Sequence, residues 1–205
     1  MAAGPVNSTG TRIPGVREVT RARAVARRRP LRYRLAVIAA DPLEAIEYAG
    51  GLLFDQSMAG WDVSVHVAEG GDTRPLEILG APLFDLSSSL SSRDSLDHRT
   101  IGPWPQAVVV SGKVFAAEER LRSATMVSID QHLLDVKLWG DDLPSELDHR
   151  CLPMSHRLSV AAKAFKRRAF AAAHIDPATV TNVESFRSAA DQATTPPNID
   201  LVPAS

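Results

Sequence analysis

Five polar residues lie at or near the ends of apolar segments and are the best candidates for chemistry: Asp41, Asp85, Ser111, Lys113 and Lys137. In an open α/β sheet, the carboxyl ends of the parallel strands meet at one edge and bind ligands there. Carboxylate, hydroxyl and ammonium groups at that edge would suit a phosphorylated ligand or a nucleotide. Loops at strand ends also attract such residues in any α/β protein. We therefore expect a ligand-binding set with no catalytic residue.

Alternating short strands and helices must position these residues. The apolar run at 34–40 predicts a buried strand, the three- and four-residue spacing over 43–58 a helix, and the alternation over 61–67 a second strand. Further strands are predicted over 81–86, 107–110 and 133–139, and helices over 74–79 and 114–126. This order predicts an α/β three-layer sandwich, with a mainly parallel sheet of about five strands and right-handed crossovers.

The rest of the chain predicts one domain with two tails. We expect a single α/β domain over 31–190, with a flexible Ser-rich loop at 87–105 and a C-terminal helical extension over 153–190. Residues 1–30 and 191–205 lack large apolar side chains in register. They cannot bury enough surface to offset the entropy of ordering, so both are predicted to be disordered.

The first 34 residues contain nine arginines and one acidic residue, Glu18, although the formal net charge of the whole chain is −1. Such an arm favours phosphate backbones through an attraction that weakens steeply with salt. The residues expected to contact nucleic acid are Arg21, Arg23, Arg27, Arg28 and Arg29. A solvated basic segment without a ligand is the alternative, because no nucleic-acid-binding motif follows.

Composition limits the compartment and the kinds of site. Cys151 is the sole cysteine, which excludes an internal disulfide and favours a reducing, cytoplasmic location. No apolar run reaches the 18–20 residues of a membrane span. The six histidines are scattered without metal-ligand spacing, so we expect no metal and no cofactor. The Ala- and Arg-rich, Lys-poor composition is typical of a GC-rich bacterial genome.

Two stretches carry a family resemblance. Residues 60–79 resemble the second strand and second helix of response-regulator receiver domains, and Asp41-Pro42-Leu43 is similar to the residues after a receiver's first strand. The resemblance implies a receiver-like or flavodoxin-like sheet, with Asp85 at the phosphorylated position and Ser111 and Lys137 near the conserved hydroxyl and lysine. The acidic pair that binds magnesium in receivers would fall at Ala39-Ala40. The resemblance therefore implies a degenerate receiver without conventional aspartyl phosphorylation.

Together these features predict a non-enzymatic regulatory protein that binds a protein partner and does not enter membranes. A homodimer is an alternative assembly. One alternative function is nucleic-acid association through the arginine arm. The other is a small enzyme with a phosphate- or nucleotide-binding site at the carboxyl ends of the strands.

Overall fold

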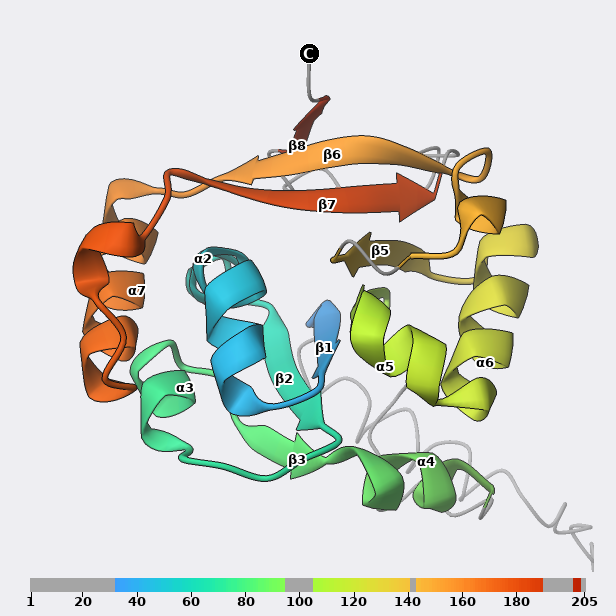
Figure 1. Ribbon diagram of the computed structural model, residues 1–205, viewed down its shortest axis with the longest axis horizontal. Coiled ribbons are helices and arrows are strands. Elements are labelled where there is room, and N and C mark those ends of the chain that lie inside the picture. The colour runs from blue at the N-terminus through green and yellow to red at the C-terminus, as the bar shows by residue number, and fades with distance from the viewer. Residues whose placement is uncertain (1–31, 95–104, 141–142, 190–200, 204–205) are drawn as a thin grey trace, which may run out of the picture. The chain divides into compact units, whose positions relative to one another are not determined.

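A computed structural model describes residues 32–94, 105–140, 143–189 and 201–203 of the chain (Figure 1). Apart from Arg32, the described residues all belong to one unit of the chain, Tyr33–Ser205. Within the described residues, no helix is long and apolar enough to cross a membrane.

One sheet of eight strands, in the order β3-β2-β1-β4-β5-β7-β6-β8, crosses this unit. Strands β1 to β5 are parallel to one another, whereas β7 pairs antiparallel with both β5 and β6, and β8 pairs antiparallel with β6. The sheet is therefore mixed, and the prediction of a mainly parallel sheet of about five strands describes only one part of it. The strands are β1 (Arg34–Ala39), β2 (Asp62–Val67), β3 (Leu83–Asp85), β4 (Ala107–Ser111), β5 (Asp135–Trp139), β6 (Cys151–Arg157), β7 (Val183–Ala189) and β8 (Leu201–Pro203).

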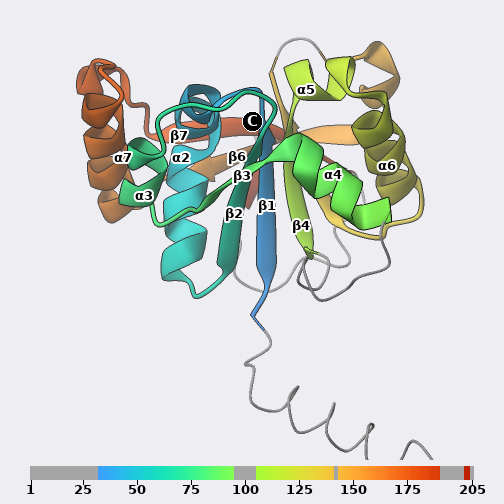
Figure 2. The same ribbon diagram turned by 90° about the horizontal axis from the view of Figure 1, so that it is seen from below.

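Helices cover both faces of the sheet, as a three-layer sandwich requires (Figures 1 and 2). Helices α2 (Pro42–Met58), α3 (Arg74–Ile78) and α7 (Val160–Ala172) bury one core with residues such as Val37 and Val109. Helices α4 (Leu86–Asp94), α5 (Gly112–Ala117) and α6 (Glu119–Asp130) lie on the other face. The second core includes Phe115, Leu121 and Leu138. Two short 3-10 helices, Ser145–Leu147 and Pro177–Thr179, complete the described helices.

The β1–α2–β2 unit forms as the sequence predicts. Both faces of β1 and β4 are buried, which explains their continuous apolar runs. Asp41 caps α2, because its side chain accepts a hydrogen bond from the Glu44 N–H at 2.9 Å. Pro42 follows at the first helical position, where its missing N–H costs nothing.

The strand order contradicts the receiver-like and flavodoxin-like label. In the flavodoxin-like order 2-1-3-4-5, the third strand lies beside the first. Here β4 takes that place, and β3 lies at the outer edge beside β2. Asp85, at the end of β3, therefore lies at the sheet edge and away from the centre where a receiver holds its phosphorylated aspartate.

Residues 153–190 form two strands as well as a helix, so the prediction of a purely helical extension is wrong. Strands β6 and β7 pair over seven residues each, and α7 lies between them along the chain. Along β7, Val183–Ala189, more and less buried positions alternate with a period of two, which a helical prediction misses.

Two further elements differ from the sequence prediction. Helix α4 occupies the first part of the segment predicted as a flexible loop over 87–105, and residues 95–104 lie outside the described residues. The helix predicted over 114–126 is divided into α5 and α6, because Glu118 adopts an extended conformation between them.

Candidate functional site

The carboxylate of Glu44 lies at the point where the order of the parallel strands reverses. Strands β2 and β3 follow β1 in one direction and β5 follows β4 in the other, so the switch point is between β1 and β4. Glu44 is in the first turn of α2 and only 6% exposed. Its Oε2 accepts from the Ala40 N–H at 2.6 Å, and its Oε1 accepts from the Ser111 hydroxyl at 2.8 Å.

Lys113 gives this cluster its positive charge and its contact with solvent. Its Nζ lies 3.8 Å from Glu44 Oε1, and its side chain is 63% exposed. Ser111 is fully buried at the end of β4, whereas Lys113 lies in the first turn of α5. A hydroxyl, a buried carboxylate and an exposed ammonium therefore meet at the switch point; we call Glu44, Ser111 and Lys113 the strand-end cluster.

Asp41 lies beside the strand-end cluster and is used in the helix cap. The pair Asp41 and Glu44 resembles a capping box. In that motif, the cap residue and the residue three positions later each accept a hydrogen bond from the other's backbone N–H. Here the Glu44 side chain reaches the N–H of Ala40, one residue before the cap. Glu44 therefore stabilises the start of α2 in addition to facing Ser111 and Lys113.

Asp85 and Lys137 do not join the strand-end cluster. Asp85 accepts from the Ser88 N–H and the Ser87 hydroxyl, both at 2.7 Å. Hydrogen bonds from the Ser88 side chain, the Ser88 N–H and the Ser87 side chain lower the pKa of its carboxyl. Lys137 lies in the middle of β5, only 2% exposed, and pairs with Asp135 two residues before it. The structure thus brings together Asp41, Ser111 and Lys113 of the five predicted residues.

Other predicted sites lie outside the described residues. Arg21, Arg23, Arg27, Arg28 and Arg29 fall within residues 1–31, so nucleic-acid contact through them stays a prediction. In the part of the chain that the structure describes, no group of three or more His, Cys, Asp or Glu side chains could hold a metal ion.

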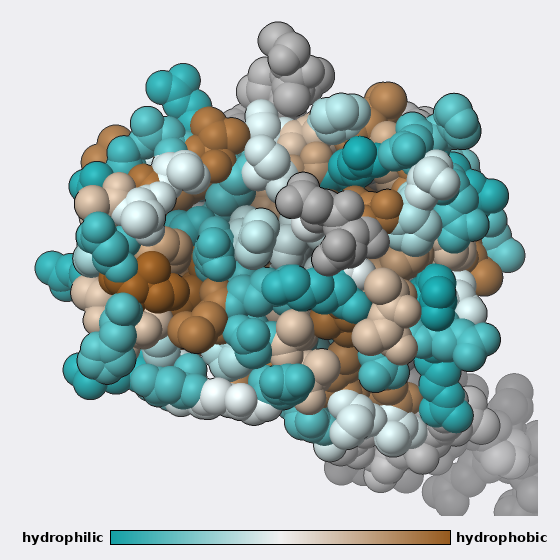
Figure 3. Space-filling model, viewed as in Figure 1, coloured by the Kyte–Doolittle hydropathy of each residue, from teal (hydrophilic) through white to brown (hydrophobic). Residues whose placement is uncertain are grey.

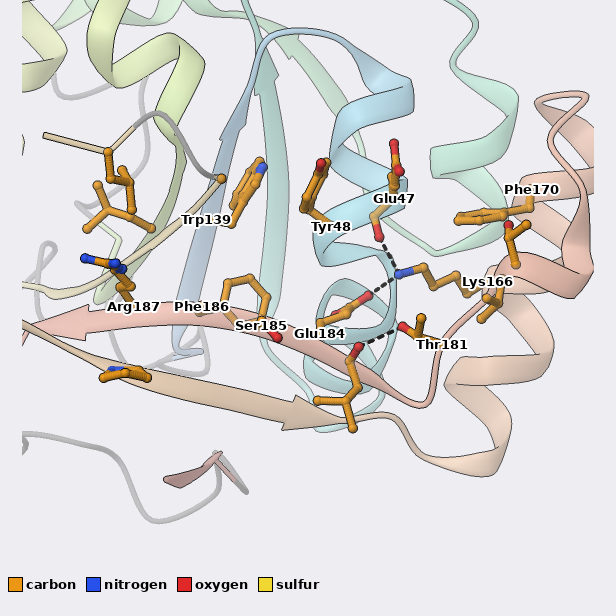
Figure 4. A pocket seen from close by; sticks show the side chains of 17 residues that line it. Glu47, Tyr48, Trp139, Lys166, Phe170, Thr181, Glu184, Ser185, Phe186 and Arg187 are labelled. Carbon is orange, nitrogen blue, oxygen red and sulfur yellow. Dashed lines mark hydrogen bonds and ion pairs between the residues drawn. The ribbon is translucent and has the colours of Figure 1, made fainter. Parts of the chain in front are cut away.

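A pocket of about 610 Å³ lies between α2, α7, the end of β5 and β7 (Figure 4). Tyr48 and Trp139 form part of its wall with nearly parallel rings, 6.2 Å apart between centroids and 14° between planes. Trp139 is 2% exposed, and its buried indole Nε1–H has no hydrogen-bond partner among the residues that the structure describes. Over the molecular face seen in Figure 3, apolar side chains gather only in small patches among polar ones.

A buried ion pair connects three elements at the floor of this pocket. Lys166 of α7 donates to Glu184 Oε1 of β7 and to the Glu47 carbonyl of α2, both at 2.6 Å (Figure 4). Glu184 also accepts from the backbone N–H groups of Gly51 and Leu52, at 2.7 and 2.9 Å. Both charges are thus satisfied by the opposite charge and by backbone groups inside α2.

The pocket and the strand-end cluster are neighbours. Ser111 and Trp139 are partners in the β4–β5 register, at the ends of the two strands. Glu44 and Tyr48 lie one helical turn apart on α2, so they face the same side. A Cβ at Gly112 would come within 3.1 Å of the Trp139 carbonyl oxygen and 3.3 Å of Leu143, so the backbone of α5 packs closely against the end of β5 at this point.

Sequence reasoning missed Glu44 and the whole pocket. The pattern Asp41-Pro42-Leu43-Glu44 was a usable signal, because an acidic residue three positions after a cap marks the start of a helix. No local signal could have indicated the pocket. Tyr48, Trp139 and Glu184 are distant in the sequence and meet only because α2, β5 and β7 pack together.

No protein-family model and no curated protein matches the chain. Among solved structures, the deacetylase Dbv21, which acts on the pseudoaglycone of the antimicrobial A40926, is similar with a TM-score of 0.51 and 15% identity over 77% of this chain and 97% of that one. A deacetylase of teicoplanin biosynthesis in complex with teicoplanin matches with a TM-score of 0.48 and 11% identity, over 84% of this chain and 99% of that one. Only the first value is high enough to indicate a shared fold.

These similarities correct two predictions made from the sequence. The solved structure that shares the fold is a deacetylase and not a response-regulator receiver, so the receiver resemblance is wrong. The prediction of a non-enzymatic, partner-binding regulator depended on that resemblance. It is therefore wrong as well, because the solved structure that shares this fold is a deacetylase. At 15% identity, what this chain shares with the A40926 pseudoaglycone deacetylase is its fold.

Proposed function

We propose that this protein is a small hydrolase that removes an acyl group from an amine at the strand-end cluster. The observation that carries the proposal is the buried Glu44 carboxylate, held by Ser111 and facing the exposed ammonium of Lys113 at the switch point. The fold shared with a deacetylase supports this reaction class. The proposal develops the alternative of a small enzyme with its site at the carboxyl ends of the strands.

The cluster has the groups that amide hydrolysis requires. Glu44 takes a proton from a water molecule whose oxygen attacks the acyl carbon. The negative charge that develops on the carbonyl oxygen lies beside the Lys113 ammonium, which stabilises it. When the carbon–nitrogen bond breaks, the departing amine takes the proton from Glu44. The products are a carboxylic acid and a free amine, and Glu44 returns to its ionised state.

Phosphate and nucleotide ligands fit this edge less well than a neutral amide. Asp41 and Glu44 are two acidic groups, and Lys113 is the basic group beside them. Like charges close together disfavour each other, so an added phosphate would face net repulsion. A cytoplasmic location and a protein partner stay predictions from the sequence.

The test is amine release from N-acetylated amino sugars and N-acetylated aromatic amines. Glu44→Gln removes the base and should lower kcat by about 100-fold or more. Lys113→Met should lower kcat by a similar factor, through loss of charge stabilisation. Glu77→Gln, an exposed change in α3, is the matched control and should leave the rate unchanged.

Helix capping by Glu44 gives a competing explanation that the same variants resolve. If Glu44 only caps α2, Glu44→Gln lowers the melting temperature and leaves the rate per folded molecule within about threefold of the wild type. That result, or no amine release from any compound by the wild-type protein, would contradict the proposal.

A further inference from the structure

We infer that the pocket between α2, β5 and β7 binds an extended, basic peptide, which adds to the sheet along the edge of β7 that faces away from β6. The pocket's volume of about 610 Å³ falls within the range of ligand-binding sites, roughly 300–1,000 Å³. Residues 183–187 of β7 all line it. This inference concerns binding alone and goes beyond the proposed function, because it gives the peptide no part in the reaction.

Strands β5 and β7 separate at the pocket. They pair at two positions, and the pair nearer the pocket is Leu138 with Arg187. In the same register Gly140 would come opposite Ser185, but the ladder of the described residues stops before that position. The φ of Gly140 is +105°, a value that L side chains rarely adopt, and the chain bends there at the end of β5. Gly140 and Ser185 both line the pocket, so the pocket occupies the wedge between the two strands.

The backbone of β7 directs polar groups into this wedge. The Leu158 N–H donates to the Asn182 carbonyl at 3.0 Å, so residue 182 directs its carbonyl toward β6. The backbone groups of successive residues point to opposite sides of an antiparallel strand, so those of Val183 and Ser185 point away from β6. The Thr181 hydroxyl donates to the Val183 carbonyl at 2.7 Å, which agrees with this direction.

In the part of the chain that the structure describes, no strand pairs with this edge of β7 at residues 183–185. An unpaired strand edge is a template for a further extended chain, which adds through main-chain hydrogen bonds. The side chains around the edge are accessible, since Val183 and Tyr48 are 42% and 39% exposed and Ser185 is exposed as well. In Figure 4, Tyr48 of α2 lies across the pocket from β7, where its ring offers apolar surface to a peptide side chain.

The charges of the wall favour a basic peptide. Both cations of the wall already have counter-charges, since Lys166 pairs with Glu184 and Arg187 pairs with Asp148. Glu47 of the wall is exposed and forms no ion pair among the described residues. A lysine or arginine side chain of the peptide therefore meets an available carboxylate, whereas an acidic side chain meets only cations that are already paired.

The experiment titrates the full chain with the peptide acetyl-Thr-Lys-Val-Lys-Thr-amide and follows the backbone amides by ¹H–¹⁵N NMR. At saturation, hydrogen exchange of the Ser185 N–H should slow about tenfold, because a peptide carbonyl accepts from it. The N–H of Phe186, which points toward β6, should exchange as before. The same peptide with methylated backbone nitrogens cannot donate to the edge of β7 and should bind about tenfold more weakly.

Variants test the position of the peptide and its charge. Ser185→Pro removes an N–H that points into the pocket and none that bonds to β6, so the Kd should rise about tenfold. Ser185→Ala keeps that N–H and is the matched control, with the Kd of the wild type. Glu47→Gln should raise the Kd about threefold, the effect of losing one exposed ion pair. Glu44→Gln, which removes the proposed base, should bind the peptide as the wild type does.

The backbone of the peptide decides between the outcomes. Binding that N-methylation and Ser185→Pro both weaken, and that Ser185→Ala and Glu44→Gln retain, supports the inference even if the protein cleaves no amide. No binding to the wild-type protein overturns it, and so does equal binding of the methylated peptide or of a peptide with glutamate in place of lysine. If circular dichroism shows that Ser185→Pro is unfolded, the methylated peptide still decides, because it is tested on the wild-type chain.

Discussion

At the scale of single residues, burial decides what each charged side chain can do. Lys166 and Glu184 are each about 2% exposed and hold one another with backbone groups of α2. Arg150 and Asp130 form a comparable pair at the surface, 41% and 55% exposed. Breaking a buried pair leaves an uncompensated charge in a poorly solvated site, whereas water replaces a lost partner at the surface.

Lys166→Met should therefore reduce the free energy of unfolding by about 3–5 kcal/mol, because Glu184 loses its counter-charge. Arg150→Met is the matched control and should cost about 0–1 kcal/mol. Urea unfolding followed by circular dichroism measures both. Adding Glu184→Gln to Lys166→Met should recover part of the loss, and equal losses for the two single variants would contradict this account.

Cys151 is buried, and burial raises the pKa of its thiol, while Arg187 and Arg150 oppose the shift. The unfolded thiol has an ordinary pKa of about 8.5, so the unfolded state loses its proton first as the pH rises. Stability is therefore unaffected below that value and falls as the pH rises through it toward the folded pKa.

Cys151→Ala should remove this contribution. The urea midpoint of the wild type relative to that of the variant should be constant near pH 7. Between about pH 8.5 and 10, the midpoint of the wild type should fall relative to that of the variant. Iodoacetamide should modify the native thiol slowly and the urea-unfolded thiol quickly. Equally fast modification of both states would show that the thiol is accessible.

At the scale of elements, α2 is the helix that both sites share. Its first turn provides Glu44, its second provides Glu47 and Tyr48, and its third offers backbone N–H groups to Glu184. Two adjacent glycines in its interior allow other elements to approach. A Cβ at Gly51 would meet Leu158 at 2.3 Å, whereas one at Gly50 would meet Leu79 at 3.3 Å.

These distances predict opposite results for two neighbouring substitutions. Gly51→Ala should lower the free energy of unfolding by about 1–3 kcal/mol, because Leu158 must move. Gly50→Ala should be neutral or stabilising by up to about 1 kcal/mol, since alanine favours a helix and the contact is only slightly tight. Thermal unfolding of the two variants measures both changes in stability. A similar loss of stability in both would indicate that helix flexibility, and not the contact with Leu158, decides the effect.

At the scale of the whole described unit, few hydrogen-bonded positions connect the antiparallel strands β6 and β7 to the parallel strands β1 to β5. Strand β7 pairs with β5 at two positions but with β6 at seven. Asp55 of α2 provides another connection, because it accepts from His156 at 2.9 Å and from the Ser159 N–H and hydroxyl at 3.1 and 2.6 Å. One carboxylate thus joins α2 to β6, through His156, and to the start of α7, through Ser159.

Asp55→Ala should let β6 and β7 open without unfolding the parallel strands. Amide hydrogen exchange in β6 and β7 should become about tenfold faster, while exchange in β1 and β4 stays as in the wild type. Asp62→Ala, which removes an exposed partner of Arg34, is the control. Uniform acceleration over all strands would show that the described unit opens as one body.

The sequence alone determined those features that depend on neighbouring residues. The apolar run of β1, the spacing along α2 and the alternation in β2 predicted the β1–α2–β2 unit. Asp41, Ser111 and Lys113 were placed at the strand ends because parallel strands end at one edge. The period-two alternation in β7 was present too, but the helical spacing before it concealed it.

Only the tertiary structure decided the strand order, and with it the fold. Whether β3 or β4 lies beside β1 depends on which strand edges pair, and similar apolar runs allow either choice. That choice moved Asp85 to the sheet edge and put Glu44 between Ser111 and Lys113. The pocket around Trp139 follows from the packing of α2, β5, β7 and α7, contacts across more than 100 residues that no local pattern records.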